Sequence, residues 1–218
     1  MQLGVDPTQC AVLLTEPPLT TFKDKTEIAR IMFEELYVAQ MQSVLASAVT
    51  LYAAGTTTGI CFVSDEDKSV AVGHFKGSLI NIFALTIHIF NESNNLYVGY
   101  AMSTTIVTLD DAGSIHEAIM GSIKASPIEI RRDLYRNIVL GGVTDISLRP
   151  AMIESVQKEI QARAPASTSV MVRCPDSIYP AFNGLSILSC LSSFETSWIT
   201  QQEFTENRSA VLEKKKLN

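Results

Sequence analysis

Apolar residues recur at steps of three and four along the first quarter of the chain, from Lys23 to Ala54. This spacing places them on one helix face, and it repeats in two consecutive groups. The pattern therefore predicts two adjoining helices, and Gly55 supplies a common helix stop. The positions that carry the pattern are Ile28, Ile31, Met32, Leu36, Met41, Val44, Leu45, Ala48, Val49 and Tyr52.

Three segments after Gly55 are rich in β-branched and aromatic residues, which predicts strands. They are Thr58 to Ser64, Lys68 to Phe75 and Leu79 to Phe90. The acidic run Asp65-Glu66-Asp67 is expected to form the turn between the first two strands. Residues 91–113 are polar and weakly periodic, so we expect a long excursion or a short hairpin there.

Helix and strand patterns alternate through the second half of the chain, which indicates an α/β fold. Capping-box spacing at Ser114 starts one predicted helix, and Ser126 is expected to cap a second helix that opens at Pro127. We expect this second helix to bury Ile128, Ile130, Leu134 and Tyr135. The later predicted elements are a strand from Asn137 to Leu140, a helix from Pro150 to Ala164 with Met152, Ile153, Val156 and Ile160 on one face, a strand from Ser167 to Cys174, a helical stretch from Gly184 to Phe194 and a short helix near Glu203.

The composition indicates a globular protein with room for one domain or two small ones. Of its 218 residues, 46% are apolar and 18% are charged. Lys and Arg number 17 against 23 Asp and Glu, and the net charge of −6 argues against a nucleic-acid or anionic-membrane surface. The longest mostly apolar run, Leu79 to Phe90, falls short of the ~20 residues that span a bilayer. The N-terminus lacks a secretory pattern, and the four cysteines lack a CxxC pair, so we expect a cytoplasmic protein.

Few residues suggest chemistry by themselves. His74, His88 and His116 are isolated, so each is expected to be an ordinary surface or satisfied core residue, and no metal site is predicted. Two turns follow predicted strands, one at Ser64 to Asp67 and one at Gly141-Gly142. Such turns place backbone N–H groups against phosphates, but the first has three carboxylates and no glycine, which disfavours an anion. The run from Lys214 to Lys216 is expected to be a solvated tail.

Whole phrases of the chain resemble the actin family, in order and at nearly the family's spacing. Each phrase is weak alone, but together they are highly specific. They are Leu13 to Leu19 (LLTEPPL), Ile31 to Glu34 (IMFE), Leu51 to Ile60 (LYAAGTTTGI), Ile115 to Glu117 (IHE), Arg132 to Tyr135 (RDLY), Asn137 to Leu140 (NIVL), Gln157 to Ile160 (QKEI), Ala164-Pro165, Ile187 to Leu191 (ILSCL), Trp198-Ile199 and Gln202-Glu203.

The resemblance implies the actin-like fold, with two ribonuclease-H-like α/β lobes and ATP with Mg or Ca between them. Residues 1–53 and 179–218 match the first inner subdomain, and residues 54–178 match the second. The outer subdomains of both lobes are expected to be missing, the second of them near residues 75–89, and so is the first phosphate hairpin.

The departures from the family concentrate at the expected nucleotide site. Family members have the loop Asp-Ser-Gly-Asp-Gly where this chain has Val63-Ser64-Asp65-Glu66-Asp67. Only Ser64 is kept, and the second glycine turn survives as Gly141-Gly142. We treat Ser64, Asp65, Asp67, Gly141 and Gly142 as a degenerate nucleotide site.

The residue that orients the attacking water in the family is Gln, and this chain matches it with Ala46. Gln42, one helical turn earlier, is a weak substitute, and the adenine-side Lys matches Ile178. Phosphoryl transfer requires an oriented water and neutralised γ-phosphate charge. We therefore expect no ATPase activity, no tight ATP binding and no resident cofactor or metal.

The family's cleft for partner helices matches seven positions of this chain. An apolar groove that receives an amphipathic helix is a common mode of protein binding. Ser197 stands where the family has an apolar cleft residue, which should weaken docking. The alternative, that these residues belong to the core, stays open. The cleft positions are Tyr52, Ala53, Gly55, Thr56, Ile187, Leu188 and Leu191.

Three functions stay open on this reading. The first is a non-catalytic actin-like protein of the cytoplasm and cytoskeleton that binds actin or actin-binding proteins, without nucleic acid or membrane. The second is an ATPase of the actin and sugar-kinase superfamily that uses Asp65 or Asp67 for the metal and Gln42 for water. The third is the product of a degenerate gene copy without a selected activity.

Overall fold

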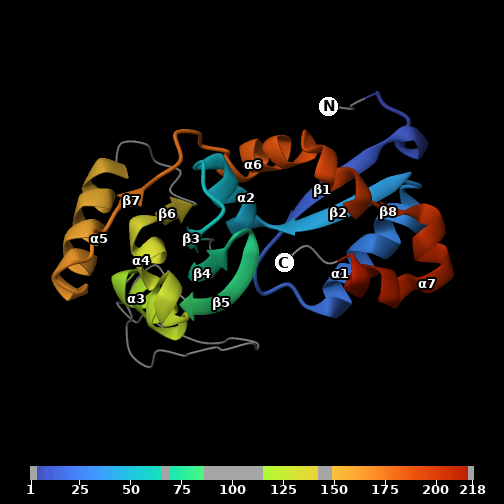
Figure 1. The fold of residues 1–218 in the computed structure, drawn as a ribbon. Coiled ribbons are helices and arrows are strands. Elements are labelled where there is room, and N and C mark those ends of the chain that lie inside the picture. The colour runs from blue at the N-terminus through green and yellow to red at the C-terminus, as the bar shows by residue number, and fades with distance from the viewer. Residues whose placement is uncertain (1–3, 65–68, 86–114, 142–148, 216–218) are drawn as a thin grey trace, which may run out of the picture. The chain divides into compact units, whose positions relative to one another are not determined.

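The computed structural model describes residues 4–64, 69–85, 115–141 and 149–215 (Figure 1). The chain divides into two compact units, each with its own β-sheet. The first comprises Met1–Ala46 and Leu185–Asn218, and the second comprises Ser47–Gly184. The mixture of helices and strands confirms the α/β class expected from the alternating patterns.

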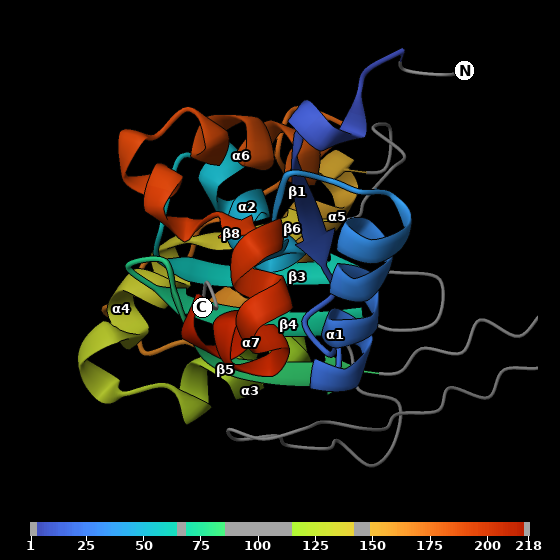
Figure 2. The same ribbon diagram turned by 90° about the vertical axis from the view of Figure 1, so that its right-hand side faces the viewer.

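The first unit contains a three-stranded sheet in the order β1-β2-β8. Strands β1 (Ala11–Glu16) and β2 (Gln40–Leu45) are parallel, and β8 (Ile199–Thr200) is antiparallel to β2. Helices α1 (Phe22–Arg30) and α7 (Gln201–Lys214) lie side by side (Figure 2). Their apolar faces meet the sheet in a core in which the Phe33 and Phe204 ring centroids lie 5.0 Å apart. The buried core residues are Ala29, Phe33, Met41, Ile199, Phe204 and Val211.

Short polar motifs set the starts of both helices in this unit. Thr21 and Asp24 form a capping box at α1, and Thr200 and Glu203 form another at α7. Each box satisfies backbone N–H groups that the first helical turn leaves unpaired. A single π-helical turn, η2 (Ile31–Glu35), ends the first helix, and two 3₁₀ segments, η1 (Pro7–Gln9) and η4 (Ser192–Ser197), complete the unit.

The second predicted helix is wrong over its first half. Residues Gln40–Leu45 form β2, and helix α2 begins only at Ala46 and ends at Ala53. Strand β2 has another strand on each side and buries Met41, Gln42, Val44 and Leu45, so its apolar positions do not alternate. Three- and four-residue spacing within such a run also fits a helix. Pairing with strand β1, which the patterns did not predict, makes this run a strand and not a helix.

The second unit contains a five-stranded mixed sheet in the order β5-β4-β3-β6-β7. Neighbours on one side of β3 are antiparallel, and those on the other side are parallel. The strands confirm the predicted segments at β3, β4 and β6, whereas β7 is shorter than expected. Their bounds are β3 (Gly59–Ser64), β4 (Ser69–Phe75), β5 (Ser78–Leu85), β6 (Ile138–Gly141) and β7 (Val172–Arg173).

Helices cover both faces of this sheet, as the alternation along β3 requires. Ile60 and Phe62 face a large core formed with helices α3 (Ile115–Ala125), α4 (Ile128–Arg136) and α5 (Arg149–Arg163). Cys61, between them, faces Leu51 of α2 on the opposite side. Successive side chains of a strand point to opposite faces, so β3 and β6 bury both of their faces. The expected inner face of α5 is confirmed, because Met152, Ile153, Val156 and Ile160 all pack on the large core.

A buried polar network ties α3 to the edge of the sheet. The Asn81 amide on β5 donates to the Ser122 carbonyl at 3.0 Å and to Ser126 Oγ at 2.8 Å, and Ser122 Oγ donates to Asn81 Oδ1. Ser126 Oγ donates in turn to the Ser122 carbonyl. The predicted capping role of Ser126 is therefore wrong, because its hydroxyl is used inside the core and Pro127 occupies the cap of α4.

The boundary between the units differs from the one expected at Ala53 and Tyr179. Helix α2 belongs to the second unit, because Leu51 packs with Cys61 and Val139 of its sheet. Helix α6 (Pro180–Ser189) starts in the same unit, where Gly184 approaches Val49 so closely that a Cβ would overlap the Val49 carbonyl. The division therefore falls after Ala46 and after Gly184.

Two smaller predictions are corrected by the structure. Ile128 is exposed rather than buried, whereas Leu134 and Tyr135 are buried as expected. Lys215 is not a solvated tail residue, because its Nζ donates to the Trp198 carbonyl and pairs with Glu203. The Lys215 ammonium is also the main reason that the pKa of the Glu203 carboxyl is lowered. The predictions for residues 65–67, 91–113, His88, Ser114 and Lys216 lie outside the described residues.

His74 on β4 is a core residue of the described chain with an unsatisfied hydrogen-bonding nitrogen. Its Nε2 lies 2.9 Å from Ser47 Oγ at the start of α2, but its buried Nδ1 has no hydrogen-bond partner among the described residues. Burial lowers the pKa of His74 to about 4. The expectation of a satisfied core histidine therefore holds for only one of its two ring nitrogens.

Acid should destabilise the protein through this histidine. The folded pKa lies below the ordinary value of about 6.5, so protons favour the unfolded chain, and stability falls as the pH drops from about 6.5 to 4. We expect the wild type to lose about 2 kcal/mol more than His74→Leu between pH 7 and pH 4.5. Urea denaturation of both proteins at each pH measures this difference. Equal losses in the two proteins would show that His74 titrates normally or not at all.

Candidate functional site

The pairing of β3 with β6 brings the strand ends that lead to the two predicted phosphate turns to one edge of the second sheet. The strands are parallel, and Val63 lies opposite Gly141. Ser64 is the last residue of β3, and Gly142 follows β6 directly. Carboxyl ends of parallel strands meet at the same sheet edge, where α/β folds place their ligands. Asp65, Asp67 and Gly142 themselves lie outside the described residues.

The strand ends below these turns are apolar. Val63 packs against the cluster of Leu51, Cys61 and Val139. Burial raises the pKa of the Cys61 thiol, which stays neutral. Thr50 of α2 covers Gly141, where a Cβ would lie 3.1 Å from the Thr50 methyl carbon. Val63, next to the end of β3, is therefore part of an apolar cluster and has no carboxylate to offer a cation.

Gln42 is held by three structural hydrogen bonds. Its Nε2 donates to the Ser197 carbonyl at 2.5 Å and to the Lys215 carbonyl at 3.0 Å, and its Oε1 accepts from the Ser43 backbone N–H at 2.9 Å. The side chain is buried. Both amide hydrogens are used in these bonds, so in this structure the Gln42 amide is committed to carbonyls of its own unit. Ala46, the matching position, begins α2 and has only a methyl group to offer.

The seven cleft positions fall in both units. Tyr52, Ala53, Gly55 and Thr56 lie in the second unit, at the end of α2 and in the turn that follows. Gly55 has φ of 75°, and Thr56 Oγ1 donates to the Thr58 carbonyl at 2.8 Å, so this turn is shaped by its own hydrogen bonds. The Tyr52 hydroxyl is half-buried, and burial raises its pKa.

The remaining cleft positions lie in the first unit. Ile187 and Leu191 are each 48% exposed, and Leu188 is half-buried. These exposures argue against the alternative that Ile187 and Leu191 belong to the core. Ser197 lies at the end of η4, where its carbonyl accepts the bond from Gln42.

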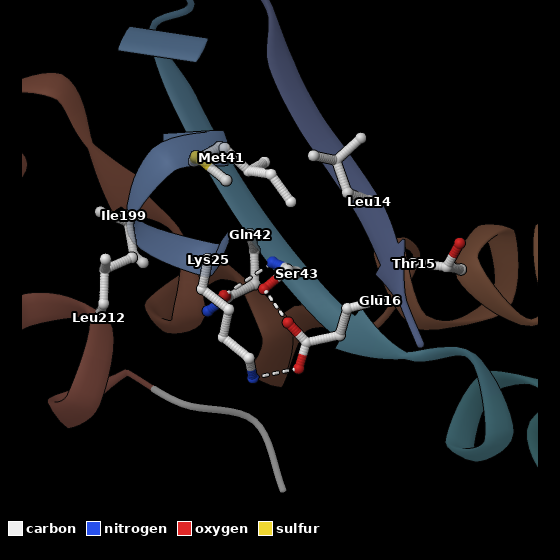
Figure 3. Close-up of a pocket in the computed structure, with 10 residues that line it drawn as sticks. Leu14, Thr15, Glu16, Lys25, Met41, Gln42, Ser43, Ile199 and Leu212 are labelled. Carbon is white, nitrogen blue, oxygen red and sulfur yellow. Dashed lines mark hydrogen bonds and ion pairs between the residues drawn. The ribbon is translucent and has the colours of Figure 1, made fainter. Parts of the chain in front are cut away.

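A small, mostly apolar pocket with a polar cluster at Glu16 in the first unit was not predicted. Lys25 of α1 pairs with Glu16 at the end of β1, and Ser43 Oγ donates to Glu16 Oε2 at 2.9 Å (Figure 3). Leu14, Met41, Ile199 and Leu212 form the apolar part of the lining. The cavity of about 40 Å³ has room for a few waters but is too small for a nucleotide. Its sequence signal is a carboxylate at the last position of an apolar strand, but that strand was itself missed.

Neither a metal site nor a membrane span is apparent in the part of the chain that the structure describes. Within residues 4–64, 69–85, 115–141 and 149–215, His, Cys, Asp and Glu side chains form no group of three or more that could hold a metal ion. In the same ranges, every helix is too short or too polar to cross a bilayer.

The family model of actin matches residues 1–89 and 82–217. The chain belongs to the actin family. This match and the two α/β sheets confirm the resemblance and the fold class, in a short form of 218 residues. The edge formed by β3 and β6 carries Val63, for which the resemblance implied an Asp in other family members.

Replacing Gln42 tests whether it has a structural or a catalytic role in this actin-family chain. Gln42→Leu leaves two buried carbonyls without donors, so we expect the free energy of unfolding to fall by about 2 kcal/mol. Phosphate release from Mg-ATP should stay at the blank level in both proteins. Thermal melts and a phosphate assay measure the two properties. Unchanged stability together with lost phosphate release would make Gln42 catalytic instead.

Proposed function

We propose that this actin-family chain is a non-catalytic protein of the cytoplasm and cytoskeleton that binds actin or actin-regulating proteins. The observation that carries the proposal is the exposed apolar pair Ile187 and Leu191 in the first unit. Two apolar residues four positions apart, each half in contact with solvent, are suited to receive the apolar face of a partner helix.

Covering the exposed side chains of Ile187 and Leu191 would contribute favourably to the free energy of binding a partner. Apolar surface removed from water contributes roughly 25 cal/mol per Å², so covering both side chains stabilises a complex by a few kcal/mol at most. Ser197 adds no apolar area next to them. We therefore propose moderate affinity for one amphipathic helix or for the surface of an actin subunit.

The case against catalysis comes from three positions. Val63 has an apolar side chain where the family has a metal-facing carboxylate. Ala46 has a methyl group where the family has a water-orienting amide. The Gln42 amide donates to carbonyls of the first unit. Glu66 and its two acidic neighbours add negative charge at the expected phosphate loop. Without an oriented water and charge neutralisation, phosphoryl transfer lacks its two main contributions.

The alternative ATPase would use Asp65 or Asp67 for the metal and Gln42 for water. The sheet edge shared by β3 and β6 favours it, because the strands that lead to both turns are adjacent. The hydrogen bonds of Gln42 disfavour it. A nucleotide would then bind through a cation alone, without the glycines that let backbone approach phosphate.

Nucleotide titration distinguishes the two functions. We expect isothermal titration of the full chain with Mg-ATP, and separately with Ca-ATP, to give no saturable heat at micromolar protein, because the acidic run repels phosphate. Actin with its nucleotide removed serves as the positive control. A submicromolar dissociation constant would overturn the non-catalytic proposal.

Co-sedimentation with preformed actin filaments tests partner binding. We expect nucleotide-independent binding that falls about tenfold in Ile187→Asp, because a carboxylate would be buried against an apolar partner. Leu36→Asp is the matched control, since Leu36 lies in the same unit and is also 48% exposed. Equal loss in both variants, or no binding by the wild type, would contradict the proposal. A non-cooperative melt of the wild type would favour the degenerate gene copy instead.

A further inference from the structure

A groove with basic walls lies in the second unit, and none of its lining residues belongs to the proposed partner site. It has a volume of about 550 Å³, within the usual range of ligand sites. We propose that this groove binds an acidic peptide segment of a partner protein, in which one apolar side chain is flanked by carboxylates. The lining residues that carry the argument are Lys124, Ile128, Arg131, Arg132, Tyr135 and Arg163.

One face of helix α4 forms the main wall of the groove. Ile128, Arg131, Arg132 and Tyr135 stand at steps of three and four, so they lie along one side of the helix. Lys124 near the end of α3 and Arg163 at the end of α5 complete the walls. Glu129 and Asp133 stand off this stripe and do not line the groove.

Hydrogen bonds within the second unit hold the groove walls in place without a ligand. Arg131 donates from Nε to the Ser126 carbonyl at 2.9 Å and from Nη2 to the Lys124 carbonyl at 2.6 Å, which joins α4 to the end of α3. On the opposite side, Gln161 Nε2 donates to the Thr168 carbonyl at 3.0 Å. A preorganised site loses less conformational entropy on binding.

Two cations of the groove are left for a ligand. Arg131 is committed to main-chain carbonyls, and Arg163 pairs with Glu159 on α5. Lys124 and Arg132 are exposed and form no ion pair with any residue that the structure describes. In a chain of net charge −6, these groups concentrate positive charge locally and complement carboxylates.

The apolar part of the groove selects a peptide rather than a phosphate chain. Ile128 is 72% exposed, the most exposed large apolar side chain of the described residues. Buried Met120 and Tyr135 lie beneath, with the Tyr135 hydroxyl 3.7 Å from the Met120 sulfur. A leucine-sized side chain is suited to this surface, because covering Ile128 removes apolar area from water.

Fluorescence anisotropy with a defined probe tests the proposal on the full chain. The probe is a fluorescein-labelled peptide with one leucine between two pairs of glutamates. We expect saturable binding that weakens about tenfold in the double variant Lys124→Glu/Arg132→Glu and about threefold in Ile128→Ser. All three positions are exposed, so the variants should fold, and Lys158→Glu on the outer side of α5 is the matched charge control.

Other probes separate the remaining outcomes. A peptide with serine in place of leucine should bind about threefold more weakly, and Ile187→Asp should bind the original probe normally, because the groove is independent of the proposed partner site. Equal binding by wild type and groove variants, or no saturable binding, would overturn the proposal. Tighter binding of inositol hexakisphosphate or phosphatidylserine vesicles through the same residues would also overturn it, in favour of a phosphate ligand.

Discussion

The parallel pairing of β3 with β6 is the constraint on which the second unit depends. It places Val63 beside Gly141 and buries both faces of each strand. One face then requires α3, α4 and α5, and the other requires α2, because uncovered apolar strands would lose the free energy of burial. The same pairing aligns the strand ends that lead to both expected phosphate turns. The pairing of β3 with β6 therefore determines both the fold of the second unit and the position of the strand ends at the candidate nucleotide site.

The first unit depends on a comparable tie between distant segments. Gln42 joins β2 to carbonyls 155 and 173 residues later in the chain, and Lys215 joins the end of α7 to its start through Glu203 and Trp198. Buried amide groups stabilise a structure only when all of their hydrogen-bonding groups are satisfied. The hydrogen bonds of the Gln42 amide are consequently used to hold the C-terminal segment in place.

The candidate nucleotide edge and the basic groove are formed by different elements of the second unit. Val63 at the β3 and β6 edge is apolar, and three carboxylates follow β3 in the sequence, whereas α4 presents cations beside an exposed isoleucine. Neither surface needs a nucleotide to be shaped, since strand pairing holds one and Arg131 holds the other. This independence from a nucleotide supports the proposed non-catalytic role.

The sequence by itself determined the family, the α/β class, most helices and strands, and the substitutions at Val63 and Ala46, because these depend on local pattern and residue identity. Only the tertiary structure decided that Met41 to Leu45 form a strand, that Gln42 and Lys215 are structural, and that Ile128 faces solvent. The strand and the two structural side chains depend on partners far away in the chain, such as β1 or Ser197. The exposure of Ile128 depends on which face of its helix has no packing partner. Periodicity records which side of an element is apolar, but tertiary contacts decide what covers it.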